Sequence, residues 1–397
     1  MKKNIKIGLF GFGCVGQGFY QLITREQCCY DIIRICTRHD KVRNAPASLF
    51  TTRAEILFND PEVDIIVEAI DDANAALQIA HHALQAGRPV ITANKKMLAE
   101  NLQSLLKWQN QYNTPVLYEA AIAASIPIVH LLSSYYKYDQ IKSISGIING
   151  SSNFILSKIT DEQRDYNEAL TLAQQLGFAE SNPFLDVSGL DSGFKLSLII
   201  YRAFGIMVDP NQLLIIGIDK LTTDDFQFAA DNGLSIKLVA EAVVDGAHLR
   251  ACVTPTILGN DDSLYHVKNE DNAITIEGHY CGHQLLGGKG AGSLPTAFAL
   301  TSDLHKCVHQ HRQVHTDTHL SLSEDGLKPV FIRSTVPNIR KYFQHILEEY
   351  HDLRSRYILG YVSVKNLKTL STYDDVTVMS FTQKSLEHYL QKLSVEV

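Results

Sequence analysis

Short apolar runs alternate with helical patterns along the first third of the chain. The runs predict buried strands at 5–10, 63–70, 89–92 and 115–118. Apolar residues recur at helical spacing in the segments 16–25, 73–86 and 99–112. Asp71-Asp72 precede the second of these helices as a cap, and Gly87 follows it as a stop. Strands that alternate with helices predict an α/β domain with a parallel sheet over residues 1–138.

The pattern changes from residue 139 onward. Residues 139–286 combine helical patterns with short strands and turn clusters, which predicts an α+β domain. His, Thr, Ser and Asp dominate residues 307–327, which favours a linker. The last segment, 328–397, predicts a small α+β domain of order β-α-β-β-α, with its first helix at 338–351.

Composition narrows the classes of function. The chain has 397 residues, with 36 Lys+Arg against 43 Asp+Glu and a net charge of −7, so a general nucleic-acid binder is not expected. The N-terminus shows no signal-peptide pattern, and no apolar stretch of about 18 residues predicts a membrane span. The seven cysteines include no C-x-x-C pair, which favours the reducing cytoplasm over a disulfide framework.

A glycine motif opens the first helix directly after the first strand. In G-x-G-x-x-G, the first glycine allows a tight turn, the second lets the backbone approach a pyrophosphate, and the third lets helix and strand pack closely. The predicted dinucleotide contacts are Gly11, Phe12, Gly13, Cys14, Val15 and Gly16. A purely structural glycine turn is the less favoured alternative.

The end of the second strand, at Cys36, is where the cofactor ribose is expected. NAD-selective enzymes place an acidic residue there, whereas an arginine accommodates a 2′-phosphate. This chain has Arg38, with Lys41 and Arg43 close behind, so NADP is favoured over NAD. The alternative is that Arg38 is a solvated surface residue.

Several further motifs carry a family resemblance. Beside GLFGFGCVGQG at the start, the chain has ITANKKMLA, LYEAAIAASIPIV, GIINGSSNFIL, LGFAESNPFLDVSGLDSGFKLSLI and GGKGAGSLPTAFAL, in this order. With these motifs the chain resembles homoserine dehydrogenase along nearly its whole length.

The resemblance implies an enzyme that interconverts L-aspartate 4-semialdehyde and L-homoserine with NADPH or NADH, in threonine and methionine biosynthesis. It implies a dinucleotide-binding Rossmann domain at 1–138, a substrate-binding and dimerisation domain at 139–286, and a return segment to the Rossmann domain at 287–306. A homodimer or homotetramer is expected. Some members carry a C-terminal ACT domain, which 328–397 resembles less closely, and this suggests L-threonine as an effector. The alternative is a degenerate domain that serves oligomerisation.

The resemblance also assigns the catalytic and substrate residues. Lys195 is implied as the acid/base, and Asp191, four residues earlier, contacts the substrate. Without the flanking motif, this i,i+4 pair would be interpreted as a routine surface ion pair. Lys95 is implied beside cofactor and substrate, Glu180 as the ligand of the substrate ammonium, and Gly177 as a residue near the cofactor.

Glu119 opens the loop that in the family binds a monovalent cation, usually sodium. The resemblance implies that the ion is bound by the backbone oxygens of Glu119, Ile122, Ala124 and Ile126. The usual Gly-Gly of this loop is replaced by Ala124-Ser125, whose Cβ atoms disfavour positive φ. The alternative, favoured equally, is that this loop only connects a strand to a helix and binds no ion.

Two further segments complete the candidates. In the glycine-rich stretch 287–292, the resemblance implies that Gly290 contacts the cofactor, with a flexible turn as the alternative. His305 and His309 have the i,i+4 spacing of a metal pair, but a solvated linker is favoured there.

The competing functions are another amino-acid or semialdehyde dehydrogenase and a non-catalytic amino-acid sensor. The presence of Lys95 and Lys195 argues against the sensor.

Overall fold

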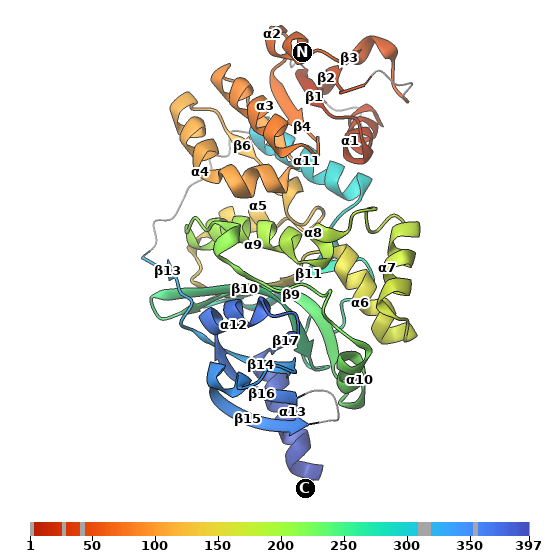
Figure 1. Ribbon diagram of the computed structural model, residues 1–397. Coiled ribbons are helices and arrows are strands. Elements are labelled where there is room, and N and C mark those ends of the chain that lie inside the picture. The colour runs from red at the N-terminus through yellow and green to blue at the C-terminus, as the bar shows by residue number, and fades with distance from the viewer. Residues whose placement is uncertain (1–3, 26–28, 40–43, 309–318, 352–355, 397) are drawn as a thin grey trace. The chain divides into compact units, whose positions relative to one another are not determined.

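The computed structural model describes residues 4–25, 29–39, 44–308, 319–351 and 356–396 (Figure 1). These residues form two compact units. Unit 1 comprises the described residues of 1–138, 197–207 and 289–317. Unit 2 comprises those of 139–196, 208–288 and 318–397.

Unit 1 is built on a parallel sheet, as the sequence predicts. Its strands in the described residues are β1 (Ile5–Phe10), β2 (Tyr30–Cys36), β3 (Phe50–Thr51), β4 (Ile65–Glu68), β5 (Val90–Thr92) and β6 (Val116–Leu117). They pair in parallel in the order β3-β2-β1-β4-β5-β6. The order reverses between β1 and β4, and ligands of such sheets bind at the carboxyl ends of the strands beside the reversal.

The helices of unit 1 cover this sheet. They are α1 (Cys14–Arg25), α2 (Ala54–Asn59), α3 (Ala73–Gln85), α4 (Lys95–Tyr112), α5 (Ile128–Ser133) and α11 (Ser293–Val308). Asp72 caps α3 as predicted, because its carboxylate accepts hydrogen bonds from the N–H groups of Asn74 and Ala75. Leu300 and Leu304 of α11 are fully buried with Ile7 and Leu9 of β1, so the late helix belongs to the core of the first domain.

Unit 2 contains a large mixed sheet. Its strands in the described residues are β7 (Ile141–Ile147), β8 (Leu214–Ile215), β9 (Ser235–Asp245), β10 (His248–Leu258), β11 (Asp271–Gly278), β12 (Gly282–Lys289, whose last residue belongs to unit 1), β13 (Ser321–Leu322), β14 (Leu327–Ser334), β15 (Phe343–His351), β16 (Arg356–Ser363) and β17 (Val376–Phe381). The main order is β12-β11-β7-β9-β10-β17-β14-β16-β15, and β8 and β13 also pair with β10. The C-terminal strands therefore continue the sheet of residues 139–288.

The helices of unit 2 are α6 (Gly150–Glu162), α7 (Tyr166–Gln175), α8 (Phe184–Val187), α10 (Thr223–Asp231), α12 (Val364–Ser371) and α13 (Gln383–Glu396), together with the first turns of α9 (Leu190–Phe204). The chain also forms short 3₁₀ turns at Ala47–Leu49, Glu119–Ala121, Tyr136–Tyr138, Pro210–Gln212 and Ile339–Tyr342.

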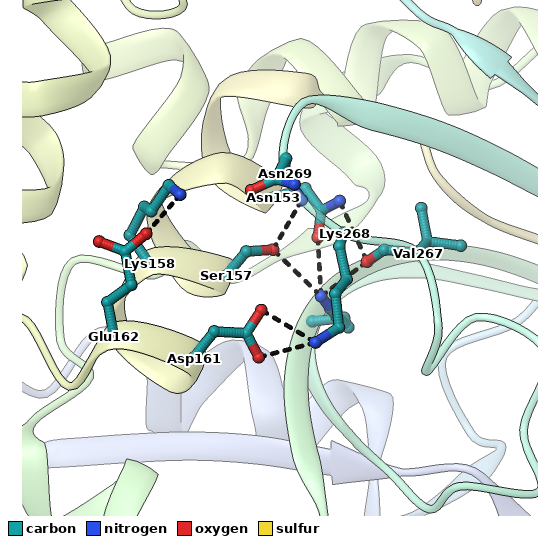
Figure 2. Close-up of polar contacts among 9 residues, drawn as sticks. Asn153, Ser157, Lys158, Asp161, Glu162, Val267, Lys268 and Asn269 are labelled. Atoms are coloured by element: carbon teal, nitrogen blue, oxygen red, sulfur yellow. Dashed lines mark hydrogen bonds and ion pairs between the residues drawn. The ribbon is translucent and has the colours of Figure 1, made fainter.

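Helix α6 packs against β9 and β11 and is tied to the loop before β11 (Figure 2). Asn153 donates to the carbonyl oxygen of Val267 at 3.3 Å, and Ser157 accepts from the N–H of Asn269 at 3.0 Å. Lys268 forms an ion pair with Asp161 at 2.8 Å. These contacts fix the helix whose N-terminal cap, Asn149, enters the candidate site below.

The predicted helix at 338–351 is wrong. A 3₁₀ turn is followed by β15, which pairs antiparallel with β16. A Cβ at Gly360 of β16 would lie 2.3 Å from the carbonyl oxygen of His345, so this glycine admits the irregular pairing of β15. The C-terminal order is thus β-β-β-α-β-α, not β-α-β-β-α, and an ACT-like domain is not confirmed. The helical prediction came from four apolar residues at helical spacing: Ile339, Phe343, Ile346 and Tyr350.

Within the described residues, no helix combines the length and the apolar character that a membrane crossing requires.

Candidate active site

The glycine loop after β1 has the shape that a dinucleotide phosphate needs. Gly11 has φ of +94°, and a Cβ built on it would lie 2.3 Å from the carbonyl oxygen of Ala69. A Cβ on Gly16 would lie 2.3 Å from the carbonyl oxygen of Gly11. A Cβ on Gly13 would meet no atom within 4 Å, so the backbone there borders open space. Because α1 begins at Cys14, its positive helix end lies at this loop, and the loop fits a pyrophosphate.

The side chains between these glycines have different environments. Phe12 is buried, and its ring packs edge-on against Tyr20 and Phe50, with centroid distances of 5.7 and 5.1 Å. Cys14 is exposed and Val15 is half-buried. Phe12 therefore serves the core with its side chain, while Cys14 lies at the surface of the loop.

Ser293 ties α11 to the glycine loop, a contact that the sequence did not reveal. Its hydroxyl donates a hydrogen bond to the carbonyl oxygen of Cys14 at 2.7 Å. A Cβ at Gly18 would lie 2.5 Å from the same hydroxyl, so this glycine of α1 allows the close approach. Gly290, three residues before Ser293, is buried in unit 1. Its contact with the cofactor stays a prediction.

Arg38 lies two residues beyond the end of β2. Its side chain is 72% exposed, and Nη2 lies 3.3 Å from Oδ2 of Asp72. A hydrogen bond from the N–H of Ala75 contributes most to a lowered pKa of Asp72, and the charge of Arg38 lowers it further. Arg38 therefore has a competing carboxylate within reach. Lys41 and Arg43, which supported the same prediction, lie outside the described residues.

The carboxyl ends of β4 and β5 are joined by a buried carboxyl group. Glu68 is fully buried and accepts hydrogen bonds from the Thr92 hydroxyl at 2.5 Å and the Ile70 N–H at 2.6 Å. Burial raises the pKa of Glu68 to about 7. The Thr92 hydroxyl also accepts from the N–H of Asn94, which caps α4 and so positions Lys95 at the first turn. No sequence motif pointed to Glu68 as a site residue, and only its burial in the structure distinguishes it.

A second site-forming cluster lies in unit 2, around Lys195. Its Nζ lies 2.8 Å from Oδ2 of Asp191, and the two residues are only 6% and 2% exposed. The ammonium also donates to the carbonyl oxygen of Ile148 at 2.7 Å. Asn149 donates from Nδ2 to Asp191 at 2.9 Å and to Asp186 at 2.7 Å. The burial rules out the routine surface ion pair that the spacing alone would suggest.

Gly177 and Glu180 follow α7 in the same unit. Gly177 has φ of +77°, which ends the helix in the left-handed conformation. The carbonyl oxygen of Glu180 accepts a hydrogen bond from Gln174 at 3.0 Å, and the residue is exposed. Its carboxylate is therefore accessible to a ligand. The predicted residues of unit 2 thus fall into two groups, one around Lys195 and one after α7.

The candidate cation loop keeps a left-handed residue in spite of its alanine. Ala124 has φ of +43°. Ser125 donates from its N–H and hydroxyl to the carbonyl oxygen of Lys289, at 3.1 and 2.9 Å. The replacement of Gly-Gly has therefore not removed the turn. Backbone carbonyls are the ligands expected for a weakly charged cation, and the residues that would supply them are all buried: Glu119, Ile122, Ala124 and Ile126.

The Glu119 side chain has a structural role. Its carboxylate accepts hydrogen bonds from the N–H groups of Val129 and His130, both at 2.8 Å, and lies 3.0 Å from Nζ of Lys306. Its own N–H donates to the buried carboxyl of Asp303 at 2.7 Å. Burial, reinforced by the charge of Glu119, raises the pKa of Asp303 to about 7. This network holds the start of α5 against α11.

The histidine-rich segment gives no metal site in the described part of the chain, where no group of three or more His, Cys, Asp or Glu side chains is arranged to hold an ion. His305 lies on α11 with Nδ1 3.3 Å from the Tyr30 hydroxyl. His309 lies outside the described residues.

A parallel sheet with a phosphate-binding glycine loop, together with a buried lysine–aspartate pair, defines the class of a dinucleotide-dependent oxidoreductase. The chain belongs to the homoserine dehydrogenase family. Residues 127–305 match the family model "Homoserine dehydrogenase", and residues 11–119 match "Homoserine dehydrogenase, NAD binding domain". The chain is thus an NAD(P)-dependent oxidoreductase for the reversible reduction of L-aspartate 4-semialdehyde to L-homoserine. The two competing functions, another dehydrogenase and a non-catalytic amino-acid sensor, are therefore set aside.

Relatives and solved structures agree with this assignment. A homoserine dehydrogenase of Bacillus subtilis is 34% identical over 313 residues, which cover 76% of this chain and 72% of the relative. The structure of a homoserine dehydrogenase from Thiobacillus denitrificans has a TM-score of 0.82 at 28% identity and covers 95% of this chain and 98% of its own. A hyperthermophilic archaeal homoserine dehydrogenase mutant in complex with NADPH shares the fold, with a TM-score of 0.68 at 24% identity over 78% of this chain and 99% of its own.

Proposed function

We propose that Lys195 is the acid/base of this reaction and that Asp191 orients it and contacts the substrate. The observation that carries the proposal is the buried contact of 2.8 Å between Nζ and the carboxylate. A nicotinamide cofactor supplies the hydride when bound. In the direction of reduction, Nζ of Lys195 donates a proton to the alkoxide oxygen. In the direction of oxidation, it accepts the proton of the substrate hydroxyl.

Two further residues complete the proposed substrate machinery. Glu180 offers an exposed carboxylate, and a carboxylate is suited to bind the ammonium group that both substrate and product carry. Lys95 begins α4 at the carboxyl end of the parallel sheet, where ligands of this fold bind. We assign Lys95 to cofactor and substrate contact, with a share in the proton relay.

NADP is the proposed cofactor, with the glycine loop on the pyrophosphate, Gly177 and Gly290 as further contacts, and Arg38 on the 2′-phosphate. The test compares the rates of NADPH and NADH oxidation with L-aspartate 4-semialdehyde in the wild type and in Arg38→Ala. We expect the wild type to favour NADPH and the substitution to raise KM for NADPH more than for NADH. Arg53→Ala, at another exposed arginine of unit 1, is the control. A wild-type preference for NADH contradicts the assignment to Arg38.

A monovalent cation, sodium in the first instance, is proposed at the backbone oxygens of the loop from Glu119 to Ile126. The left-handed φ of Ala124 supports the proposal, because the loop keeps this turn without glycine. The proposal predicts that activity depends on added sodium or potassium when the counter-ion is otherwise a bulky organic cation. If activity is the same with sodium, with potassium and with the organic cation alone, the loop is a connection between strand and helix that binds no ion.

L-threonine as an effector rests on the resemblance alone, because the order of the C-terminal elements departs from the predicted one. The test is a titration of activity with L-threonine. A flat titration would remove the effector and leave oligomerisation as the role of residues 328–397. We further propose a homodimer or homotetramer, which sedimentation would measure. The domain limits and the cytoplasmic location also stay predictions.

A further inference from the structure

Asn149 is a buried amide that contacts three groups at once. Its Oδ1 accepts a hydrogen bond from the N–H of Ser152 at 2.8 Å and so caps α6. Its Nδ2 donates to Oδ1 of Asp186 at 2.7 Å and to Oδ2 of Asp191 at 2.9 Å. The residue is 4% exposed. The amide is thus oriented by its cap, with both amide protons directed at carboxylates.

The residue before it holds the other partner of the ion pair. Lys195 donates to the carbonyl oxygen of Ile148 at 2.7 Å and pairs with Asp191 at 2.8 Å. The consecutive residues Ile148 and Asn149 therefore contact the lysine and its aspartate separately. A shift of this dipeptide would move both sides of the ion pair.

The backbone at this position is firmly placed. A Cβ at Gly150 would lie 2.7 Å from the carbonyl oxygen of Glu270, so the start of α6 lies against the loop before β11. Further along, α6 is fastened to the same loop through Asn153 and Ser157 (Figure 2). The helix gives Asn149 a fixed base from which to hold the carboxylates.

The chemistry explains why an amide stands here. Two carboxylates that share a neighbour repel each other, and a primary amide can donate one N–H to each of them. A lysine or arginine could also bridge them, but it would add a second positive charge beside Lys195 and compete for Asp191. A neutral donor holds both carboxylates and leaves Asp191 to pair with the lysine.

We propose that Asn149 is a positioning residue of the active site: its amide holds Asp191 against Lys195 by bridging Asp191 to Asp186. The inference rests on the proposed role of Lys195. Asn149 acts through the carboxylates and not on the substrate itself.

Two substitutions separate this role from the capping of α6. Asn149→Ser keeps an oxygen that can cap the helix but removes both N–H donors. We expect kcat to fall by about 10- to 100-fold, with a smaller change in KM, because the acid/base loses its alignment. Asn149→Asp also keeps a capping oxygen but adds a carboxylate next to Asp191 and its partner Lys195. One limb of the pH–rate profile reports the titration of Lys195. In Asn149→Asp this limb should move to higher pH, because added negative charge favours the ammonium form.

Asp165→Ser is the matched control, because Asp165 caps α7 through the N–H of Glu168 and is exposed. It should leave kcat and the pH profile unchanged. Thermal unfolding of each variant separates loss of fold from loss of alignment. If Asn149→Ser keeps the wild-type kcat, or if Asn149→Asp keeps the wild-type pH profile as a folded protein, the inference is wrong. If Lys195→Ala itself keeps full activity, the failure lies in the proposed function instead.

Discussion

Lys195 and Lys237 are two buried lysines of unit 2 with opposite surroundings. They are 6% and 3% exposed. Lys195 pairs with the carboxylate of Asp191, whereas Lys237 donates to neutral oxygens of Val267 at 2.7 Å, Asn153 at 3.1 Å and Ser157 at 3.4 Å. Burial lowers the pKa of Lys237 to about 8. The comparison shows that two equally buried lysines can have partners of different charge. A paired carboxylate holds the ammonium of Lys195 in place, while Lys237 fastens α6 to a loop.

Glu68 of unit 1 repeats the Lys237 arrangement with a carboxyl group. Its partners, the Thr92 hydroxyl and the Ile70 N–H, are neutral, and burial raises its pKa to about 7. Both groups are thus shifted toward their uncharged forms. Substitutions and the pH dependence of the free energy of unfolding can distinguish the Lys195–Asp191 pair from Lys237 and Glu68.

The largest effect on stability is expected from Lys195→Met. The substitution leaves the carboxylate of Asp191 buried without its ammonium, and breaking such a pair costs about 3–5 kcal/mol. The free energy of unfolding in urea measures the loss. The double variant Lys195→Met/Asp191→Asn removes both charges and should recover a large part of it. If the double variant loses as much as Lys195→Met and Asp191→Asn lose separately when added together, the pair contributes no coupling.

Lys237→Met tests the other lysine through pH. Between pH 8 and 10.5 the unfolded chain holds a proton on Lys237 that the folded protein has lost, so the free energy of unfolding rises with pH across this window. The methionine variant lacks this rise. The difference between wild type and variant should therefore grow by roughly 3 kcal/mol from the lower to the upper pH. Parallel curves would mean that Lys237 stays charged in the fold.

Glu68→Gln gives the same test with the opposite sign. Between pH 4.5 and 7 the folded protein holds a proton on Glu68 that the unfolded chain has lost, so the free energy of unfolding falls as pH rises. The glutamine variant escapes this fall and should gain about 3 kcal/mol relative to wild type over the window. Urea unfolding at both ends of the window measures the gain. If the difference in the free energy of unfolding between variant and wild type is the same at pH 4.5 and pH 7, Glu68 does not titrate in this window.

The smallest effect is expected from Lys268→Ala. Lys268 follows Val267 and forms an ion pair with Asp161 (Figure 2). The side chains of this pair are 53% and 41% exposed. Exposed pairs contribute about 0–1 kcal/mol. Urea unfolding of the variant should thus differ little from wild type at neutral pH. A loss as large as that of Lys195→Met would contradict the division into buried and exposed pairs.

Local signals predicted the parts of the fold that depend on local residues. Asp72 and the helix that it caps, the glycine turn at Gly11 and the parallel sheet of unit 1 follow from neighbouring residues and from periodicity. The segment 338–351 has helical spacing but pairs with β16, and that tertiary partner decides its structure. Periodicity within one segment cannot show such a partner.

The candidate site divides in the same way. The family motifs pointed to Asp191 and Lys195, and the structure adds that the pair is buried. The amide of Asn149 bridges Asp186 and Asp191, which lie 37 and 42 positions further along the chain, and no spacing rule connects Asn149 with them. The left-handed φ of Ala124 runs against the preference of its residue type, so the sequence does not predict it.

The most direct measurement compares Lys195→Ala with Lys237→Ala in the reduction of L-aspartate 4-semialdehyde, followed by NADPH absorbance and by the homoserine formed. We expect folded Lys195→Ala to lose about 10²- to 10⁴-fold in kcat, while Lys237→Ala keeps turnover close to wild type. Wild-type turnover in Lys195→Ala would contradict the assignment of the acid/base to the paired lysine.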